Sequence, residues 1–249
     1  NYNKKMNTTK IEWTDRVWNP SKGCSKISEG CKYCYAESFA KRLQAMGMED
    51  YKDGFKFKIL PHRLNEPLKI KKPQKFFVNS MSDLFHDDMP EEYLNQIFDV
   101  INQTPQHTYQ ILTKRAENMF EYFQNHNVPE NVWLGVTVEN SKYLYRVDIL
   151  RKINATIKFV SFEPLIGSVG KIDLTNIDWA IVGGESGNRA RLIKHEWVNE
   201  IYLQCKKQNV PFFFKQWGTW GADGIKRNKK ANGKLFKNKE WHEYPVVRI

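Results

Sequence analysis

Short apolar segments alternate with longer amphipathic patterns along most of this chain, and this alternation limits the folds open to it. The apolar segments, each of four or five residues, are 76–79, 108–112, 132–136, 158–161, 179–182 and 211–214. Helical spacing of apolar residues marks 35–43, 90–102, 116–124, 141–152 and 195–208. Ser141 is the expected N-cap of the fourth of these helices. With an extended lead-in over 11–20, about seven strands are expected. Fully apolar strands of this kind lie parallel under helices on both faces or close into a barrel, so the chain is predicted to be α/β.

The two ends of the chain differ from this alternating region. Residues 1–10 contain lysines but no apolar core of a secretory signal, and we expect a disordered leader. Residues 11–218 are the predicted α/β domain, and 219–249 a basic C-terminal extension. No apolar run approaches the roughly 18 residues that cross a bilayer, so no membrane partner is expected. The hydrophobic content of 41% excludes wholesale disorder.

Three of the four cysteines lie close together, at Cys24, Cys31 and Cys34, with a glycine directly before the first two. Thiolates at this spacing suit one soft metal centre. Structural zinc normally takes four ligands, whereas an iron–sulfur cluster with three thiolates keeps one iron open. The alternatives are a zinc site completed by a distant residue such as His62, His86 or His195, and three unmodified thiols. Cys205 follows a helical pattern and is expected to be a buried core thiol.

The sequence Cys31-Lys32-Tyr33-Cys34 resembles the cluster loop of the radical S-adenosylmethionine superfamily. The common spacing in that superfamily has three residues between the first two cysteines, and this chain has six. The resemblance implies a [4Fe–4S] cluster on Cys24, Cys31 and Cys34 whose open iron is chelated by S-adenosylmethionine. It also implies an external electron donor, a 5′-deoxyadenosyl radical that abstracts hydrogen from substrate, and a partial (β/α) barrel rather than a doubly wound sheet. A reducing cytoplasm suits such thiols.

Each predicted strand runs into a polar cluster, and in parallel α/β folds ligands bind at the carboxyl ends of the strands. The clusters are 79–83, 113–115, 137–140, 161–164, 183–187 and 215–217. Together with Ile11-Glu12-Trp13-Thr14 and the cysteine loop, they make nearly the whole chain resemble the phage-type radical S-adenosylmethionine-like family. That family suggests no particular substrate.

Roles for the strand-end residues follow from their chemistry. Small and polar side chains suit the ribose and ammonium groups of S-adenosylmethionine, and the residues expected to bind this cofactor are Ser80, Ser82, Asp83, Glu139, Asn140, Gly183, Gly184 and Glu185. Charged side chains suit a carboxylate or phosphorylated substrate, and the expected contacts are Lys114, Arg115, Glu163 and Lys215.

Beyond Trp217 the chain is rich in lysine. Seven basic residues lie between Lys226 and Lys239, around Asn232-Gly233, a strong two-residue hairpin signal. Trp220, Phe236 and Trp241 lie among them, a mixture suited to phosphates and exposed bases. A solvated lysine-rich appendage is the alternative. The net charge of +11 is consistent with a polyanionic partner.

The leading hypothesis is a radical S-adenosylmethionine enzyme that abstracts hydrogen from a nucleotide or a DNA or RNA base, in modification or repair. One alternative is a zinc-stabilised nucleic-acid-binding protein without catalysis. The other is a radical enzyme that acts on a small phosphorylated metabolite.

Overall fold

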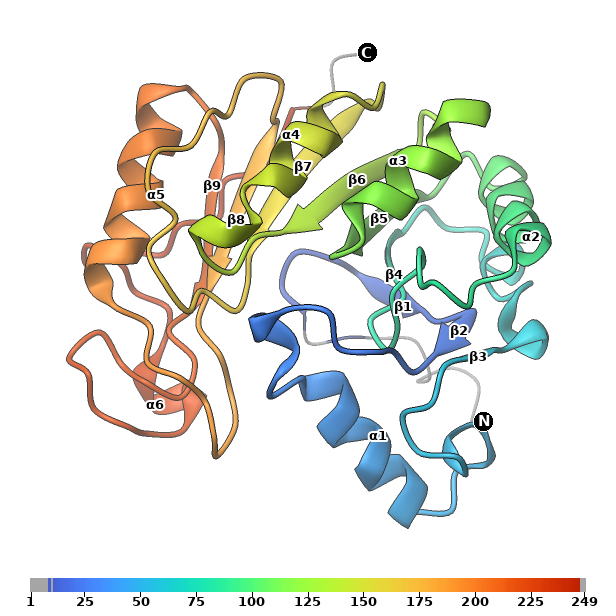
Figure 1. The fold of residues 1–249 in the computed structure, drawn as a ribbon, viewed down its shortest axis with the longest axis horizontal. Helices are drawn as coiled ribbons and strands as arrows, with labels where there is room; N and C mark the ends of the chain where they lie inside the picture. Colours follow the sequence, from blue (N-terminus) through green and yellow to red (C-terminus); the bar gives the residue numbers. More distant parts are fainter. Residues whose placement is uncertain (1–8, 10, 247–249) are drawn as a thin grey trace. The chain divides into compact units, whose positions relative to one another are not determined.

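The computed structural model describes Thr9 and residues 11–246 (Figure 1). The predicted leader, apart from Thr9, therefore lies outside the described residues. Seven strands form one sheet in the order β1-β4-β5-β6-β7-β8-β9, and a separate two-stranded sheet contains β2 and β3. The seven strands follow one another in chain order, without the reversal that defines a doubly wound sheet. The predicted α/β partial barrel of six or seven parallel strands is confirmed.

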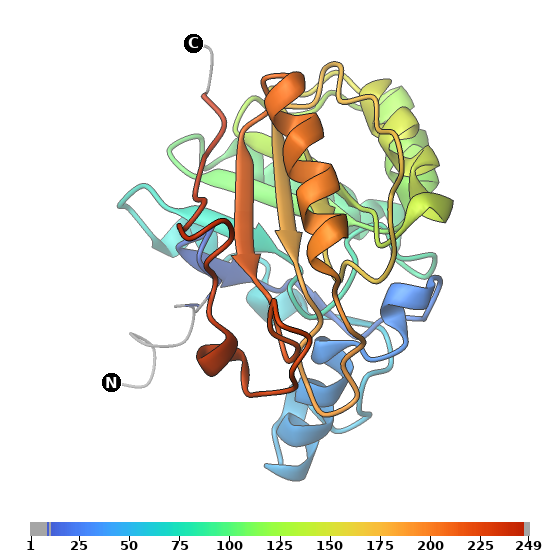
Figure 2. The ribbon, with the colours of Figure 1, turned by 90° about the vertical axis from the view of Figure 1, so that its left-hand side faces the viewer.

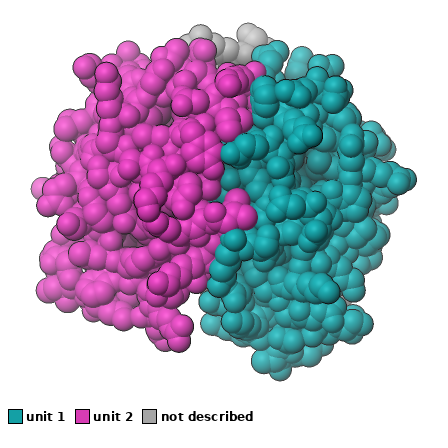
Figure 3. Space-filling model, in the orientation of Figure 1, with its two compact units in different colours: residues 1–26, 36–134, 154–156 teal, residues 27–35, 135–153, 157–249 magenta. Residues whose placement is uncertain are grey.

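The chain divides into two compact units (Figure 3). The first comprises residues 1–26, 36–134 and 154–156, and the second comprises 27–35, 135–153 and 157–249. The boundary falls inside β6 (Val132–Thr137) and inside the cysteine loop, so Cys24 belongs to the first unit and Cys31 and Cys34 to the second.

The first unit is built on β1 (Arg16–Trp18), β4 (Lys75–Val78) and β5 (Thr108–Thr113), which pair in parallel. Its helices are α1 (Tyr35–Ala45, whose first residue belongs to the second unit), α2 (Glu91–Asn102) and α3 (Ala116–Asn125). Phe76 pairs with Tyr109 in register, and the two rings stack 5.5 Å apart. The chain between α1 and β4 contains β3 (Lys58–Ile59), which pairs with β2 (Ser21–Lys22), and three 3-10 turns, Glu49–Tyr51, Pro61–Arg63 and Pro67–Lys69.

The second unit contains the parallel strands β7 (Ile157–Phe162), β8 (Trp179–Gly183) and β9 (Phe212–Gln216). Its helices are α4 (Tyr145–Arg151), α5 (His195–Lys207), which lies along β8 and β9 in Figure 2, and α6 (Lys229–Asn232). As expected, no helix forms between β7 and β8. The expected cap at Ser141 is wrong, because α4 begins only at Tyr145 after the N-cap Leu144; Ser141–Tyr143 is a separate 3-10 turn, capped by Asn140, whose side chain accepts from the Lys142 N–H.

The basic C-terminal segment packs on the second unit. Phe236 and Trp241 are buried, and the backbone N–H of Phe214 on β9 donates to the carbonyl of Trp241. The predicted hairpin turn at Asn232-Gly233 is wrong: Asn232 ends α6, and Gly233 terminates that helix with a positive φ. A tight antiparallel turn forms instead at Lys237-Asn238, between the bridged residues Phe236 and Lys239. Among the described residues, none of the helices is both long and apolar enough to cross a membrane.

Candidate functional site

In the first unit, Cys24 follows a backbone held against the end of β4. The N–H of Gly23 donates to the Met81 carbonyl at 2.9 Å, and the Ser82 hydroxyl donates to the Gly23 carbonyl at 2.7 Å. Gly23 has φ +78°, and a Cβ there would lie 2.1 Å from the Lys56 carbonyl oxygen, so no other residue fits. Ser82, predicted to contact the cofactor, thus supports the cysteine loop.

Arg115 is the charged neighbour of Cys24. Its Nη1 lies 3.5 Å from the Cys24 sulfur, and its Nη2 donates to the Ser25 hydroxyl at 2.6 Å. Only 4% of Arg115 is exposed, so its charge needs compensation, which Asp83 and Asp87 supply at 3.4 and 3.3 Å. The predicted substrate contact Arg115 is therefore directed at a cysteine.

Asp83 is engaged on both carboxylate oxygens. It accepts from the Thr113 hydroxyl at 2.6 Å and from the Lys114 backbone N–H at 3.1 Å, in addition to Arg115. Ser80 donates to Asn19. The predicted cofactor residues Ser80, Ser82 and Asp83 thus lie at one strand end, as expected, and their contacts join the segments around β1, β4 and β5.

His86 supports the residue next to Cys24. The Asp88 N–H donates to His86 Nδ1 and the Ser25 backbone N–H donates to His86 Nε2, both at 3.1 Å, and the Ser25 hydroxyl lies 3.0 Å from Nε2. Burial, and then the charge of Arg115, lowers the pKa of His86. The imidazole is therefore neutral at pH 7.

In the second unit, Ser28 links Cys31 to a buried ion pair. The Ser28 hydroxyl lies 3.5 Å from the Cys31 sulfur and also donates to the Glu139 carboxylate. Glu139 is fully buried and pairs with Arg146 at 2.9 Å. A Cβ on Gly30 would lie 2.4 Å from Glu139, so glycine lets the loop approach this carboxylate. Glu139, predicted to bind ribose, anchors the cysteine loop.

Glu29 ties the same loop to further strand-end residues. Its carboxylate accepts from Lys142 at 2.6 Å and from the Asn140 side-chain amide at 3.0 Å. The hydrogen bond from Lys142 lowers the pKa of Glu29. Arg191 donates to the Glu29 carbonyl at 2.8 Å, and its guanidinium lies 5.3 Å from the centre of the Tyr33 ring.

Glu185 holds Arg191 with both carboxylate oxygens, at 2.6 Å from Nη2 and 3.0 Å from Nε. This bidentate pair is the stronger form of a guanidinium–carboxylate contact, and it raises the pKa of Arg191. The preceding Gly184 passes against the backbone of Trp217, where a Cβ would lie 1.9 Å from the carbonyl oxygen. Gly184 was predicted to let a ligand approach the backbone closely, and here the backbone of Trp217 occupies that position.

Glu163 and Lys215 form a further ion pair at the strand ends, 2.8 Å apart. The Ser161 hydroxyl also donates to Glu163 at 3.2 Å. Gly183 leaves room for this carboxylate, because a Cβ there would lie 2.7 Å from it. The side chains of Glu163 and Lys215 are 15% and 24% exposed, so both predicted substrate contacts retain accessible surface.

Sequence reasoning gave no role to Ser28, Glu29, Arg146 or Arg191. The sequence does contain a sign that Arg146 is buried, because it lies four residues before the buried Leu150 on the apolar face of α4. A charged residue at such a position is rarely buried without a partner. No comparable sequence pattern identifies Arg191, because it follows a polar, irregular segment.

The cysteines differ in environment. Cys24, Cys31 and Cys34 are unbridged and partly exposed, whereas Cys205 is buried as expected, and burial raises the pKa of its thiol to about 12. Within the described part of the chain, no three His, Cys, Asp or Glu side chains are grouped as ligands of a metal ion.

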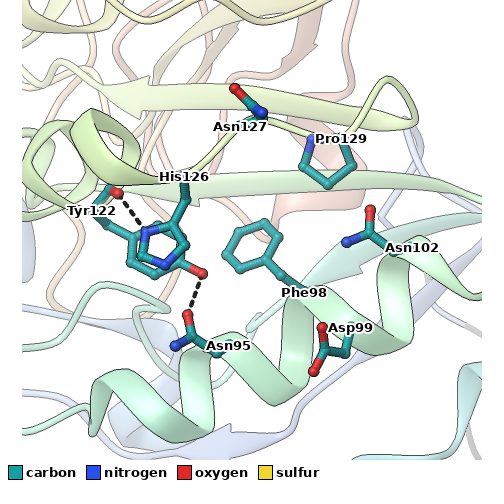
Figure 4. A pocket seen from close by; sticks show the side chains of 8 residues that line it. All are labelled: Asn95, Phe98, Asp99, Asn102, Tyr122, His126, Asn127 and Pro129. Atoms are coloured by element: carbon teal, nitrogen blue, oxygen red, sulfur yellow. Dashed lines mark hydrogen bonds between the residues drawn. The ribbon is translucent and has the colours of Figure 1, made fainter.

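A pocket of about 300 Å³ lies in the first unit, lined by α2, α3 and the chain after α3 (Figure 4). The Tyr122 hydroxyl donates to Asn95 at 2.8 Å, and His126 stacks on Tyr122 with ring centres 4.1 Å apart. None of the residues that line it is a cysteine or a strand-end residue of the sequence prediction.

Residues 8–245 match the family described as Protein of unknown function (DUF5131). The chain belongs to this family. No curated protein and no solved structure gives a significant match. Membership in the DUF5131 family extends over the cysteine loop and every strand-end cluster described above.

Proposed function

We propose that the chain is a radical S-adenosylmethionine enzyme whose [4Fe–4S] cluster is bound by Cys24, Cys31 and Cys34. The observation that carries the proposal is the cysteine loop: three partly exposed, unbridged thiols within eleven residues, the last before α1. Three thiolates leave one iron of such a cluster for an exogenous ligand. Cysteines without disulfide bonds suit a reducing compartment, and we propose the cytoplasm.

The surroundings of two cysteines fit this group. Arg115 Nη1 and the Ser28 hydroxyl each lie 3.5 Å from a cysteine sulfur, at Cys24 and Cys31 respectively. Donors to ligand sulfurs set the orientation of the ligands and the reduction potential of iron–sulfur centres. Both donors are themselves fixed by carboxylates, Asp83 for Arg115 and Glu139 for Ser28.

When bound, the cluster would supply the electron that cleaves S-adenosylmethionine. The chain's own residues would orient the loop and meet the substrate. Glu163 and Lys215 are the best placed to meet it, because the pair offers an acceptor and a donor and retains exposed surface. A nucleotide or nucleic acid base, whose edge carries donors and acceptors, is the substrate class that we propose, with an external electron donor.

Reductive cleavage of S-adenosylmethionine tests the proposal. Protein reconstituted anaerobically with iron and sulfide is mixed with S-adenosylmethionine and dithionite, and 5′-deoxyadenosine and methionine are measured by chromatography. We expect both products from the unaltered chain and none from Cys31→Ala. The Cys205→Ala protein is the control and should retain the reaction. Absence of both products from a chain that holds iron and sulfide would contradict the proposal.

A further inference from the structure

Three lysines gather around two aromatic rings of the second unit. Lys206 comes from α5, and Lys237 and Lys239 come from the tight turn near the C-terminus. The ammonium groups of Lys206 and Lys237 lie 5.7 and 4.9 Å from the centre of the Tyr202 ring. Those of Lys206 and Lys239 lie 4.9 and 3.6 Å from the centre of the Trp241 ring. We call Lys206, Lys237 and Lys239 the lysine cluster.

Positive charge in the lysine cluster is incompletely neutralised. Lys206 pairs with Glu243. Lys237 and Lys239 are exposed, and within the described residues no carboxylate lies at ion-pair distance from either. The aromatic faces stabilise the ammonium groups modestly but carry no net charge. Like charges held together at a surface attract an anion.

The turn that carries two of these lysines is firmly held. Phe236 and Lys239 are bridged, and Lys237 and Asn238 have left-handed backbone conformations. Phe236 and Trp241, on either side, are 1% and 8% exposed, and the Trp241 indole donates to the Phe236 carbonyl at 2.9 Å. The backbone that carries Lys237 and Lys239 is therefore positioned before any partner binds.

The same burial argues against base stacking on Phe236 and Trp241, two of the three aromatic residues named for it from the sequence, whereas Trp220 is half-buried. Phe236 and Trp241 lie in the core, and their accessible faces are next to lysines, so neither offers a platform for a base. Lysine is a compact charge suited to phosphate, without the fork geometry of arginine that reads base edges.

We propose that the lysine cluster binds the phosphodiester backbone of a nucleic acid, without sequence preference. This deepens the nucleic acid part of the proposed function, but it does not depend on the iron–sulfur cluster. Backbone contacts of this kind release counterions, so the affinity falls linearly on a log–log scale against salt.

The test is fluorescence anisotropy with a labelled single-stranded oligonucleotide of mixed sequence, titrated at several salt concentrations. The variant is Lys237→Gln with Lys239→Gln. The control is Lys71→Gln with Lys72→Gln, two exposed adjacent lysines of the first unit whose loss changes the net charge equally. In the variant, the loss of two phosphate contacts should reduce the slope of log affinity against log salt by about 1.4. It should also weaken binding roughly 25-fold near 0.1 M salt. The control should keep nearly the original slope.

Equal effects of the two double variants, or no binding by the unaltered chain at low salt, would overturn the proposal. Vesicles containing phosphatidylserine provide a third arm. One outcome would assign the surface to lipid headgroups instead: the Lys237→Gln, Lys239→Gln protein alone loses vesicle binding, while its oligonucleotide binding stays intact. Iron content, measured on the same preparations, reports separately on the proposed cluster and should be equal in all three proteins.

Discussion

The Nη1 atom of Arg115 lies 3.5 Å from the sulfur of Cys24, and only 4% of Arg115 is exposed to solvent. If Cys24 binds the proposed cluster, a buried guanidinium next to its sulfur favours the more negative, reduced state of that cluster. This electrostatic effect is strong where little water screens it.

Replacing Arg115 by Gln should therefore make the cluster harder to reduce. At a fixed potential we expect roughly tenfold less reduced cluster, which corresponds to a downward shift of about 59 mV for one electron. Redox titration followed by electron paramagnetic resonance measures this shift. Lys58→Gln, which removes an exposed charge from β3 in the same unit, is the control. An unchanged potential in Arg115→Gln would contradict the role given to this contact.

Glu139 and Arg146 form an ion pair whose two side chains are 0% and 1% exposed. Replacing Arg146 by Met strands a buried carboxylate, and the free energy of unfolding should fall by about 3–5 kcal/mol. Arg151→Met removes a more exposed arginine from the same helix and should cost no more than about 1.5 kcal/mol. Urea denaturation compares them. Adding Glu139→Gln to Arg146→Met should recover part of the lost free energy of unfolding. A smaller loss of that free energy for Arg146→Met than for Arg151→Met would contradict the importance of the ion pair.

The buried His107 makes stability depend on pH. Its Nε2 lies 2.9 Å from the Ile70 carbonyl oxygen, its Nδ1 accepts from the Gln74 N–H, and burial lowers its pKa below the ordinary 6.5. Below that value the unfolded chain binds a proton that the folded chain does not. Stability should therefore fall as the pH decreases from 6.5 toward the folded pKa, by at most about 1.4 kcal/mol per pH unit.

His86, with a similarly lowered pKa, adds to this dependence. The measurement is urea denaturation at about pH 7.5 and about pH 5.5, where His107→Gln should show a smaller difference between the two conditions than the unaltered chain. An equal or larger difference in the variant would show that His107 is not titrating as described.

The Glu185–Arg191 pair distinguishes cofactor binding from support of the loop. If Glu185 contacts S-adenosylmethionine, Glu185→Gln should weaken its binding by about 1–3 kcal/mol, and Arg191→Gln should weaken it less. Anaerobic equilibrium dialysis measures both, with iron content expected to stay constant. Equal losses in the two variants would mean that Glu185 acts only by holding Arg191.

Most of the sheet and most of the helices were predictable because their signals are local. The apolar segments at 76–79 and 179–182 coincide with β4 and β8 to within one residue at each end. Turn chemistry was less informative: Asn232-Gly233 ends a helix, whereas the turn forms at Lys237-Asn238. Composition favours Asn232-Gly233, because lysine rarely adopts the positive φ that Lys237 has, so the turn at Lys237-Asn238 is set by the packing around it.

The candidate site was predictable in its residue types and not in its contacts. Ser28 and Glu139 are 111 residues apart, and nothing in the local pattern links them. The lysine cluster likewise combines α5 with a turn about thirty residues further along the chain. Strand-end polarity therefore identified residues such as Glu139 and Glu185, but which carboxylate faces which cation depends on packing.

Metal analysis of anaerobically purified and reconstituted protein tests the central claim most directly. We expect about four irons and four labile sulfides per chain. The Cys24→Ala, Cys31→Ala and Cys34→Ala proteins should lose them, and Cys205→Ala should retain them. Stoichiometric zinc with tetrahedral sulfur and nitrogen coordination and no labile sulfide would contradict the account.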